Sequence, residues 1–247
     1  MLTPEEKQRY DRQIIIPGIG ETGQEKLKKA RVVIAGSGGL GSPISLYLAA
    51  AGLGTLRVID NDRVELSNLN RQILHWDKDI GKEKALSAQE KLTQLNKHVT
   101  VETINITIDE ANVYSLTDGF DVIVDAMDNM ATRFLLNKAA IKYNIPFVHG
   151  AVSGLEGRAI TVIPGKSACI RCIYHGTAPN IKFPVLGTTP AIIGAIQATE
   201  VIKYLTGIGT LLTNRLLIYD GLNMRFTELS VIRNANCEHC GSSVLDK

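Results

Sequence analysis

The sequence is short of several features that mark whole classes of protein. Its 247 residues carry 27 Lys and Arg against 25 Asp and Glu, and this near-neutral balance predicts no binding to nucleic acid or to an anionic membrane. The apolar stretches at 44–53 and 191–205 are too short or too interrupted to span a bilayer. The N-terminus is charged at once and lacks a signal-peptide core. We therefore expect a cytoplasmic protein.

Cysteine is scarce, and its four positions form two Cys-x-x-Cys pairs, Cys169 with Cys172 and Cys237 with Cys240. In a reducing compartment such pairs indicate a zinc site of four thiolates, which needs no further ligand. Two disulfides and a thioredoxin-like redox pair are the alternatives. A filled zinc site would join a central loop to the C-terminal tail and would not catalyse. We expect His239, inside the second pair, to be exposed.

The sequence does contain a regular alternation of short apolar strands and helices. Strands are expected at 31–35, 55–59, 99–103, 121–125 and 146–150, and helices at 42–51, 82–95 and 130–143. This alternation predicts an α/β fold, a Rossmann-like doubly wound sheet that is parallel in its first half. Antiparallel strands are expected at 157–163, 216–219 and 226–232, with a loop at 164–189 and a helix at 190–205.

We expect one domain, residues 1–247, in three parts. They are an N-terminal helical arm (1–30), a nucleotide-binding half (31–150) and a substrate-binding and zinc half (151–247). Within the arm, Thr3, Pro4 and Glu6 have the spacing of a helix start with a capping box. Thr22 and Glu25 repeat that spacing and predict a second short helix, reaching about residue 30.

A glycine loop follows the first strand and opens a helix, with glycines at Gly36, Gly38, Gly39 and Gly41. Glycine permits a tight turn and a close approach of phosphate oxygens to backbone N–H groups at the positive end of the helix. Asp60 ends the next strand, where its carboxylate can accept from a ribose hydroxyl. This pattern predicts nucleotide binding, and by itself it favours an NAD or FAD enzyme.

The polar residues after the later strands favour ATP instead. Asn68 and Arg71 lie in a loop rich in donors and acceptors, Lys84 begins a helix, and Asp128 follows the fourth strand. Because strand ends converge beside the glycine loop, cations and a carboxylate would meet the phosphates there. The pyrophosphate of NAD needs no metal-binding carboxylate, whereas ATP travels with Mg²⁺. We interpret Lys82 as a solvated charge, and Asp62 fits a turn-capping role equally well.

At these residues the chain resembles the ubiquitin-activating-type adenylyltransferases, specifically the bacterial and archaeal MoeB/ThiF/HesA group. The resemblance extends from about Arg9 to Cys240, through the glycine loop, Ser-Asn-Leu-Asn-Arg-Gln at 67–72, Gly-Lys-x-Lys at 81–84 and Asp-Asn at 128–129. It implies a ribose contact at Asp60, phosphate contacts at Asn68, Arg71 and Lys84, Mg²⁺ at Asp128, and zinc at the four cysteines. It also implies that Arg12 reaches in from a partner subunit, and hence a homodimer.

The reaction implied by the resemblance is adenylation of a carboxylate by ATP, which yields an acyl-adenylate and pyrophosphate. A carboxylate is already ionised at neutral pH, so no general base is needed. Many relatives then use a cysteine or a rhodanese domain. Here zinc would consume all four cysteines, residues 174–189 contain none, and the length leaves no room for such a domain. We therefore expect the reaction to stop at the adenylate.

The identity of the carboxylate stays open at this point. The commonest choice in the family is the C-terminal Gly-Gly of a ubiquitin-like sulfur carrier of the MoaD/ThiS type, in cofactor biosynthesis. A small molecule is the alternative, such as a pyridinol precursor of the iron-hydrogenase cofactor, or a modified adenosine in tRNA, against which the neutral charge argues. An NAD-dependent Rossmann oxidoreductase is a more remote possibility, and an inactive partner subunit is a third class.

Overall fold

A computed structural model describes residues 1–174 and 183–241 of the chain. Within them, eight strands form one sheet in the order β3-β2-β1-β4-β5-β6-β7-β8. The first five strands are parallel, and β6, β7 and β8 extend the sheet in antiparallel fashion. The strands are β1 (Arg31–Ala35), β2 (Thr55–Ile59), β3 (Thr100–Ile104), β4 (Val122–Asp125), β5 (Phe147–Ser153), β6 (Glu156–Val162), β7 (Arg215–Asp220) and β8 (Arg225–Ser230).

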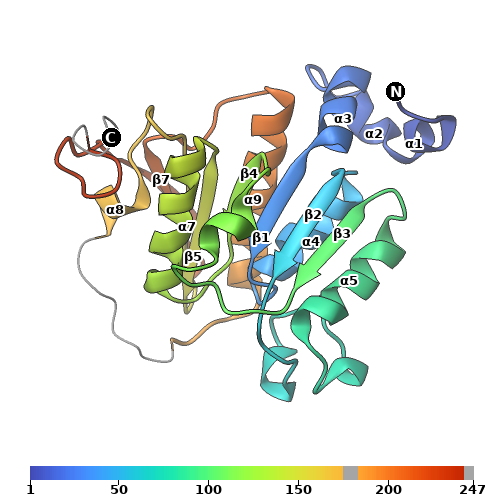
Figure 1. Ribbon diagram of the computed structural model, residues 1–247, viewed down its shortest axis with the longest axis horizontal. Coiled ribbons are helices and arrows are strands. Elements are labelled where there is room, and N and C mark those ends of the chain that lie inside the picture. Colours follow the sequence, from blue (N-terminus) through green and yellow to red (C-terminus); the bar gives the residue numbers. More distant parts are fainter. Residues whose placement is uncertain (175–182, 242–247) are drawn as a thin grey trace.

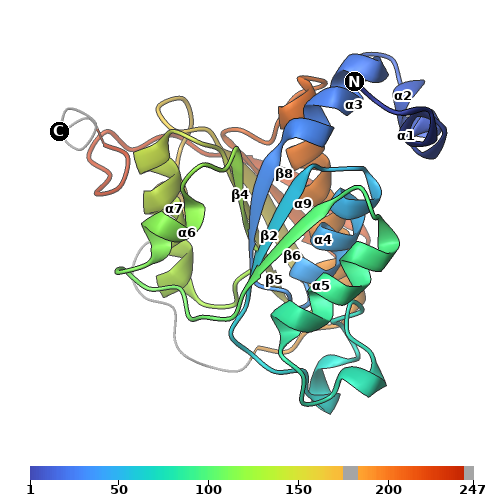
Figure 2. The same ribbon diagram turned by 45° about the vertical axis from the view of Figure 1, so that its right-hand side comes forward.

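Helices cover both faces of the sheet, as Figures 1 and 2 show. The helices α4 (Gly41–Ala50), α5 (Lys84–Leu95) and α9 (Thr188–Thr206) lie on one face, and α6 (Val113–Thr117) and α7 (Met130–Tyr143) on the other. The arm contains α1 (Pro4–Arg9), α2 (Asp11–Ile14) and α3 (Gly20–Lys29). Three short helices complete the list: the 3₁₀ helices η1 (Leu66–Asn68) and η2 (Asp77–Asp79), and α8 (Ile170–Ile173). The predicted α/β fold with an antiparallel extension is confirmed.

The strand order places a topological switch at β1. The chain passes from β1 outward to β2 and β3, and then returns to the other side of β1 with β4. Loops leaving β1 and β4 therefore diverge onto opposite faces, and in folds of this kind ligands bind beside the carboxyl ends of these strands. The sheet thus brings together, at the carboxyl ends of its parallel strands, the glycine loop, the segment after β2 and the segment after β4.

Two hydrophobic cores lie on the two faces of the sheet. The first packs the inner sides of α4 and α9 against β1 and β2, and includes Ile44, Leu48 and Val201. The second packs α7 against β4, β5 and β6, and includes Leu136 and Phe147. Three cysteines, Cys169, Cys237 and Cys240, belong to this second core. The cysteine pairs therefore sit within the packing of the fold rather than in an appendage.

Several local predictions are wrong. Helix α3 begins at Gly20, so Thr22 lies inside the helix and caps nothing. The first part of the arm forms two short helices, α1 and α2, and a further helix that was not expected, α6, precedes β4. The predicted loop at 164–189 contains α8, overlaps the first turn of α9, and includes residues 175–182, which lie outside the described residues. No helix in the described parts of the chain is long and apolar enough to cross a membrane.

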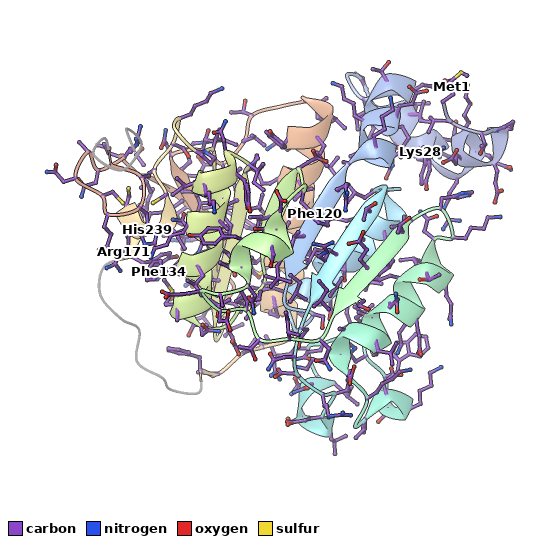
Figure 3. The ribbon with its side chains drawn as sticks, in the orientation of Figure 1. Met1, Lys28, Phe120, Phe134, Arg171 and His239 are labelled. Carbon is purple, nitrogen blue, oxygen red and sulfur yellow. The ribbon has the colours of Figure 1, made fainter. Side chains whose placement is uncertain are left out.

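The first helix begins as the sequence predicts. Thr3 accepts a hydrogen bond from the backbone N–H of Glu6, and the Glu6 carboxylate accepts one from the N–H of Thr3, at 3.2 and 2.7 Å. The same carboxylate, only 2% exposed, pairs with Lys28 of α3 at 2.8 Å. Lys28 lies beside the first residues of the chain in Figure 3. One buried carboxylate thus caps α1 and joins it to α3.

Burial alone would raise the pKa of Glu6, but the hydrogen bonds from Lys28 and Thr3 outweigh it and lower this pKa from 4.5 to about 2. The ionised form therefore stabilises the fold above pH 4.5, and the effect is lost as the pH falls toward 2. We predict that Glu6→Gln lowers the free energy of unfolding by about 2 kcal/mol at pH 7, a figure reduced for the partial exposure of Lys28.

Urea denaturation of both proteins at each pH measures this difference, and comparison at equal pH cancels the other acidic groups. The difference should shrink between pH 4.5 and 2. Glu5→Gln is the matched control, since Glu5 lies on the same helix but is 56% exposed. A difference that stays constant over this range would contradict the assignment.

Candidate functional site

The glycine loop joins β1 to α4 in a turn that only glycine can form. Gly36 has a φ of +98°, and a Cβ there would lie 2.6 Å from the carbonyl oxygen of Ala126. A Cβ on Gly41 would lie 2.0 Å from the carbonyl oxygen of Gly36. Gly38 and Gly39 have more room, and neither backbone N–H donates a hydrogen bond within the described residues. Gly36 and Gly41 therefore shape the turn, and Gly38 and Gly39 offer free donors.

Asp60, at the end of β2, is tied to the glycine loop. Its Oδ2 accepts hydrogen bonds from the backbone N–H and the hydroxyl of Ser37, at 2.7 and 2.9 Å. Its Oδ1 accepts from the N–H of Asp62 at 2.9 Å. The carboxylate is half-buried and fixed beside the free N–H groups of the loop. This is the place predicted for the acidic residue that meets a ribose.

Lys84 is a buried cation at the first position of α5. Its side chain is 6% exposed, and its Nζ pairs with Oδ2 of Asp62 at 2.8 Å. Asp62 is 61% exposed, so the pair opens to solvent on the carboxylate side. Lys82 lies near by in sequence but pairs outward with Glu90, in agreement with its interpretation as a surface charge. Asp62 is an ion-pair partner of Lys84 as well as a turn residue.

The loop after β2 brings Asn68 and Arg71 to the same edge. Asn68 is buried, and its Oδ1 accepts from the N–H of Glu65 at 3.1 Å. The Nη1 of Arg71 donates to the carbonyl of Ser67 and to Oδ1 of Asn70, at 2.9 and 3.1 Å. A Cβ built on Gly39 would meet the Arg71 side chain at 3.6 Å, so this cation borders the glycine loop.

Asp128 follows β4, one residue before the N-cap of α7, and is exposed. No hydrogen bond or ion pair occupies its carboxylate within the described residues. A carboxylate with no other partner fits the preference of Mg²⁺ for exposed oxygen ligands.

A buried cluster supports the turn that carries Asp128. Asp125 is fully buried, and its Oδ1 accepts from the N–H of Met127 at 2.9 Å. Its Oδ2 accepts from Nδ1 of His149 at 2.6 Å and lies 3.4 Å from Nε of Arg133. Burial lowers the pKa of His149, more than Asp125 raises it, so the ring is neutral and Arg133 balances the charge. The sequence predicted no role for these buried residues, because isolated polar residues in apolar segments give no pattern.

Arg12 lies far from the residues just described. It is exposed on α2, and its neighbour Gln13 donates to the carbonyl of Ala51, directly after the end of α4. The glycine loop lies at the other end of α4, about 15 Å away for a helix of this length. Figure 1 likewise shows the arm at the end of the sheet where β1 begins. Arg12 therefore does not join Arg71 and Lys84 within one chain.

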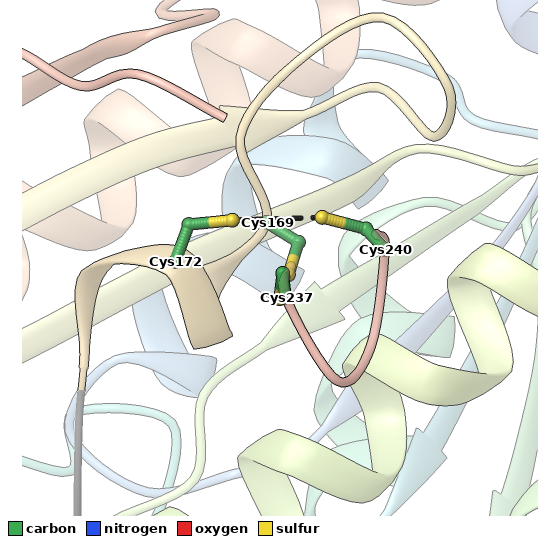
Figure 4. Close-up of side chains that lie close together, drawn as sticks. All are labelled: Cys169, Cys172, Cys237 and Cys240. Carbon is green, nitrogen blue, oxygen red and sulfur yellow. Dashed lines mark hydrogen bonds between the residues drawn. The ribbon is translucent and has the colours of Figure 1, made fainter. Parts of the chain in front are cut away.

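The four cysteines converge although the two pairs are far apart in sequence (Figure 4). All four thiols are free, and their sulfur atoms lie within 4.8 Å of one another. The Sγ atoms of Cys169 and Cys237 are 3.7 Å apart, and those of Cys172 and Cys240 are 3.5 Å apart. Four Zn–S bonds of ordinary length in a tetrahedron place sulfurs about 3.8 Å apart. The spacing fits a cation with tetrahedral coordination, and neither sulfur pair is at the bonded distance of a disulfide.

The surroundings of the cluster also favour a cation. Burial, and after it the neighbouring Cys240, raise the pKa of Cys169. Four thiolates in so small a volume repel one another unless a cation replaces their protons. The backbone N–H of Asn234 points at the Cys172 sulfur, at 3.4 Å. The cluster can therefore hold a metal through four thiolates.

His239 is buried, with 7% exposure, so the expectation that it is exposed is wrong. The side-chain amide of Asn137 donates to its Nδ1 at 2.9 Å, and the ring packs edge-on against Phe134, with 5.6 Å between centroids. Figure 3 shows Phe134 and His239 together beside Arg171. Burial lowers the pKa of His239 to about 4. It is a neutral packing residue that docks the second cysteine pair onto α7.

Comparison with known proteins shows the family to which this chain belongs. The ThiF family profile matches residues 10–240. The SAMP-activating enzyme E1 of Haloferax volcanii is 44% identical over 244 residues, which cover 96% of this chain and 90% of that protein. The sulfur carrier protein adenylyltransferase of Thermus thermophilus is 42% identical over 250 residues, covering 97% and 92%. A crystal structure of Escherichia coli MccB with MccA-N7isoASN superposes with a TM-score of 0.86 at 25% identity, covering 96% of this chain and 75% of that one. The chain belongs to the ThiF family.

Proposed function

We propose that this protein uses ATP to adenylate the C-terminal Gly-Gly carboxylate of a ubiquitin-like sulfur-carrier protein. The proposal rests on one observation: the glycine loop, Asp60 and Lys84 meet at the carboxyl ends of the parallel strands. The relatives named for SAMP activation and for sulfur-carrier adenylylation support the same reaction and the same class of substrate.

The positions of the side chains support a specific set of nucleotide contacts. Asp60 receives the ribose hydroxyls, and the N–H groups of Gly38 and Gly39 meet phosphate oxygens. Asn68, Arg71 and Lys84 surround the phosphates, with Lys84 exchanging part of its pairing with Asp62 for the nucleotide. Asp128 would hold Mg²⁺, which would neutralise phosphate charge when bound.

The reaction forms one bond and breaks another. An oxygen of the carrier carboxylate attacks the α-phosphorus, and the bond from that phosphorus to the bridging oxygen breaks, releasing pyrophosphate. A C-terminal carboxyl has a pKa of about 3.5, so it is ionised at neutral pH and no base is required. The enzyme must align two anions and neutralise the charge that develops on the leaving group, which Arg71 and Lys84 are suited to do.

We propose that Cys169, Cys172, Cys237 and Cys240 bind zinc in a structural role. The sulfur spacings and the free state of all four thiols support this ion. Zinc would stabilise the second core by joining the α8 segment to the C-terminal segment. Because the chain has no other cysteine, the adenylate would pass to its acceptor without a thioester on this enzyme.

The outer edge of the sheet favours a protein substrate over a small molecule. Strand β8 pairs with β7 on one side only in the described sheet, and it is exposed along its length. Apolar side chains gather around it: Leu222, Met224, Phe226, Leu229 and Ile232 are each at least 50% exposed. Phe226 and Leu229 lie on opposite faces of β8, so apolar surface is exposed on both sides of this unpaired edge, which is suited to pairing with another chain. A pyridinol-type acid would use no such surface.

The position of Arg12 supports a homodimer. A cation on the arm of one chain can complete a nucleotide site only if that site belongs to a second copy, as closed two-fold symmetry allows. Arg12 is exposed and has no ion-pair or hydrogen-bond partner in the described residues, so it is available for this role.

We predict ATP–pyrophosphate exchange only when a Gly-Gly-tailed carrier protein is present. The exchange rate is measured with the carrier, with the carrier lacking its last glycine, and with a panel of small acids that includes a pyridinol carboxylate. Exchange with a small acid alone would overturn the carrier proposal in favour of the small-molecule alternative. Preference for NAD over Mg-ATP would overturn adenylation itself. A carrier–enzyme thioester on the zinc-loaded protein would contradict the thiol-free route.

The site assignment makes its own prediction. Arg71→Ala and Asp128→Ala should each lower exchange by about 100-fold or more, because each removes charge stabilisation from the transferring phosphoryl group. Lys84→Ala should behave in the same way, whereas the matched control Lys82→Ala should exchange normally, since Lys82 pairs with Glu90 at the surface. Zinc content should stay constant in all four. Normal exchange by Arg71→Ala or Asp128→Ala would refute the assignment.

The cysteine cluster predicts one zinc ion per chain, measured by elemental mass spectrometry. Cys169→Ser should lose the ion and lower the midpoint of thermal unfolding, because the remaining thiols of the second core then have no metal to join them. Dialysis against a chelator should make all four thiols reactive toward a thiol reagent. Adding zinc back should protect them again. Full zinc content in Cys169→Ser would show that the cluster is not the binding site.

The homodimer predicts complementation between two inactive variants. In a mixed dimer of Arg12→Ala and Arg71→Ala chains, one site receives an intact Arg71 and an intact Arg12, and the other receives neither. Random pairing of co-expressed chains should therefore restore about one quarter of the wild-type exchange rate. Two separately inactive variants that give no activity when co-expressed would place Arg12 outside the site.

A further inference from the structure

A chain of buried hydrogen bonds runs behind the glycine loop and ends on it. It begins at Lys91 of α5, whose Nζ pairs with the buried Asp79 and donates to the hydroxyl of Ser87 at 2.8 Å. Ser87 Oγ lies 2.9 Å from Nδ1 of His75, and Nε2 of His75 lies 3.0 Å from the carbonyl oxygen of Ser37. Every side chain in it is at most 7% exposed.

The groups at the two ends of this hydrogen-bond chain fix which atom donates in each of its hydrogen bonds. The Ser37 carbonyl can only accept, so Nε2 of His75 carries the proton and donates. Nδ1 is then the acceptor, and it receives the hydroxyl hydrogen of Ser87. Ser87 in turn accepts from the Lys91 ammonium, which can only donate. All the hydrogen bonds therefore point from the Lys91 cation toward the Ser37 carbonyl, and each polarises the next.

His75 must be neutral for this arrangement. Burial lowers its pKa below the usual value, more than the Ser37 carbonyl raises it, and Lys84 lowers it further. The charged groups that face the ring are Lys84 and Lys91 of α5 and Asp60 after β2. An imidazolium could not accept from Ser87, so the neutral Nε2–H form is the one that completes the chain.

The Ser37 carbonyl shares its peptide plane with the N–H of Gly38. The described peptide bonds are all trans, and in a trans peptide the C=O and the following N–H point in opposite directions. A carbonyl held toward His75, with a second, longer contact from Ser42 at 3.4 Å, therefore directs the Gly38 N–H away from the protein interior. That N–H donates no hydrogen bond within the described residues, so it is available to a ligand.

We propose that His75 is a positioning residue that aims the Gly38 N–H at a phosphate of ATP, with Ser87 and Lys91 holding its tautomer. This inference rests on the proposed ATP site and adds a residue to it. In this arrangement His75 touches neither the nucleotide nor the substrate carboxylate, because Ser37 lies between His75 and the ligands. Its contribution should depend on the phosphates of the ligand and not on the nucleoside.

The test compares affinity for Mg-ATP, measured by calorimetry, with affinity for adenosine, measured by ligand-observed NMR. His75→Leu should raise the Kd for Mg-ATP by about tenfold, the effect of losing a well-aimed hydrogen bond to a charged group. Its Kd for adenosine should stay unchanged. His75→Gln keeps an N–H of similar reach and should raise the Kd for Mg-ATP by no more than about threefold.

His98→Leu is the matched control, because His98 lies beside Glu5 of the N-terminal arm. This variant should leave both affinities unchanged. Ser87→Ala keeps the ring but removes its Nδ1 donor, and it should weaken Mg-ATP binding by about threefold with adenosine unaffected. This variant carries the test if His75→Leu does not fold. Equal losses for Mg-ATP and adenosine, or no loss of Mg-ATP affinity, would overturn the role of His75. Failure of the unaltered protein to bind Mg-ATP would instead overturn the proposed function.

Discussion

The close approach of α4 to the end of β1 is the constraint on which the rest of this structure depends. Gly41 and Gly36 stand so near that a single methyl group between them would collide with backbone. This contact turns the chain sharply enough to leave the N–H groups of Gly38 and Gly39 facing outward at a helix start. Asp60 and the Lys84–Asp62 pair hydrogen-bond to this loop or lie beside it, so an altered turn would displace them all.

The glycine turn and the turn that carries Asp128 are each held from the interior by a buried polar side chain, His75 and Asp125. Behind the glycine loop, His75 holds the Ser37 carbonyl while Asp60 holds the Ser37 N–H. Behind the Asp128 turn, Asp125 holds the N–H of Met127 and is itself balanced by His149 and Arg133. Each group fixes a peptide plane from the interior side. A reaction in which no side chain of the enzyme acts as the nucleophile relies on such positioning, because alignment and fixed charge must supply the acceleration.

Local pattern predicted the fold well and the support of the site poorly. Strands β1 and β2 and helix α7 agree with the expected bounds, because their apolar runs and flanking signals lie within one short segment. Thr22 shows the limit of a local signal, since packing of α3 begins the helix earlier than its capping pattern indicates. His75, His149 and His239 acquire their roles from partners distant in sequence. Nothing near them in the chain reveals such a partner, so one sequence could not distinguish them from solvated residues.

The two cysteine pairs show the opposite case, in which spacing alone predicted a tertiary contact. A Cys-x-x-Cys pair supplies half of a tetrahedral set, so two pairs in a chain with no other cysteine imply each other. Their meeting also has a consequence for chemistry. The sulfur atoms lie in the second hydrophobic core, on the face of α7 and away from the glycine loop on α4. A thiol relay would need a sulfur at the crevice, and the fold places all of them in the packing that supports α7. The separation of the thiols from the proposed phosphate site thus favours adenylation over acyl transfer to cysteine.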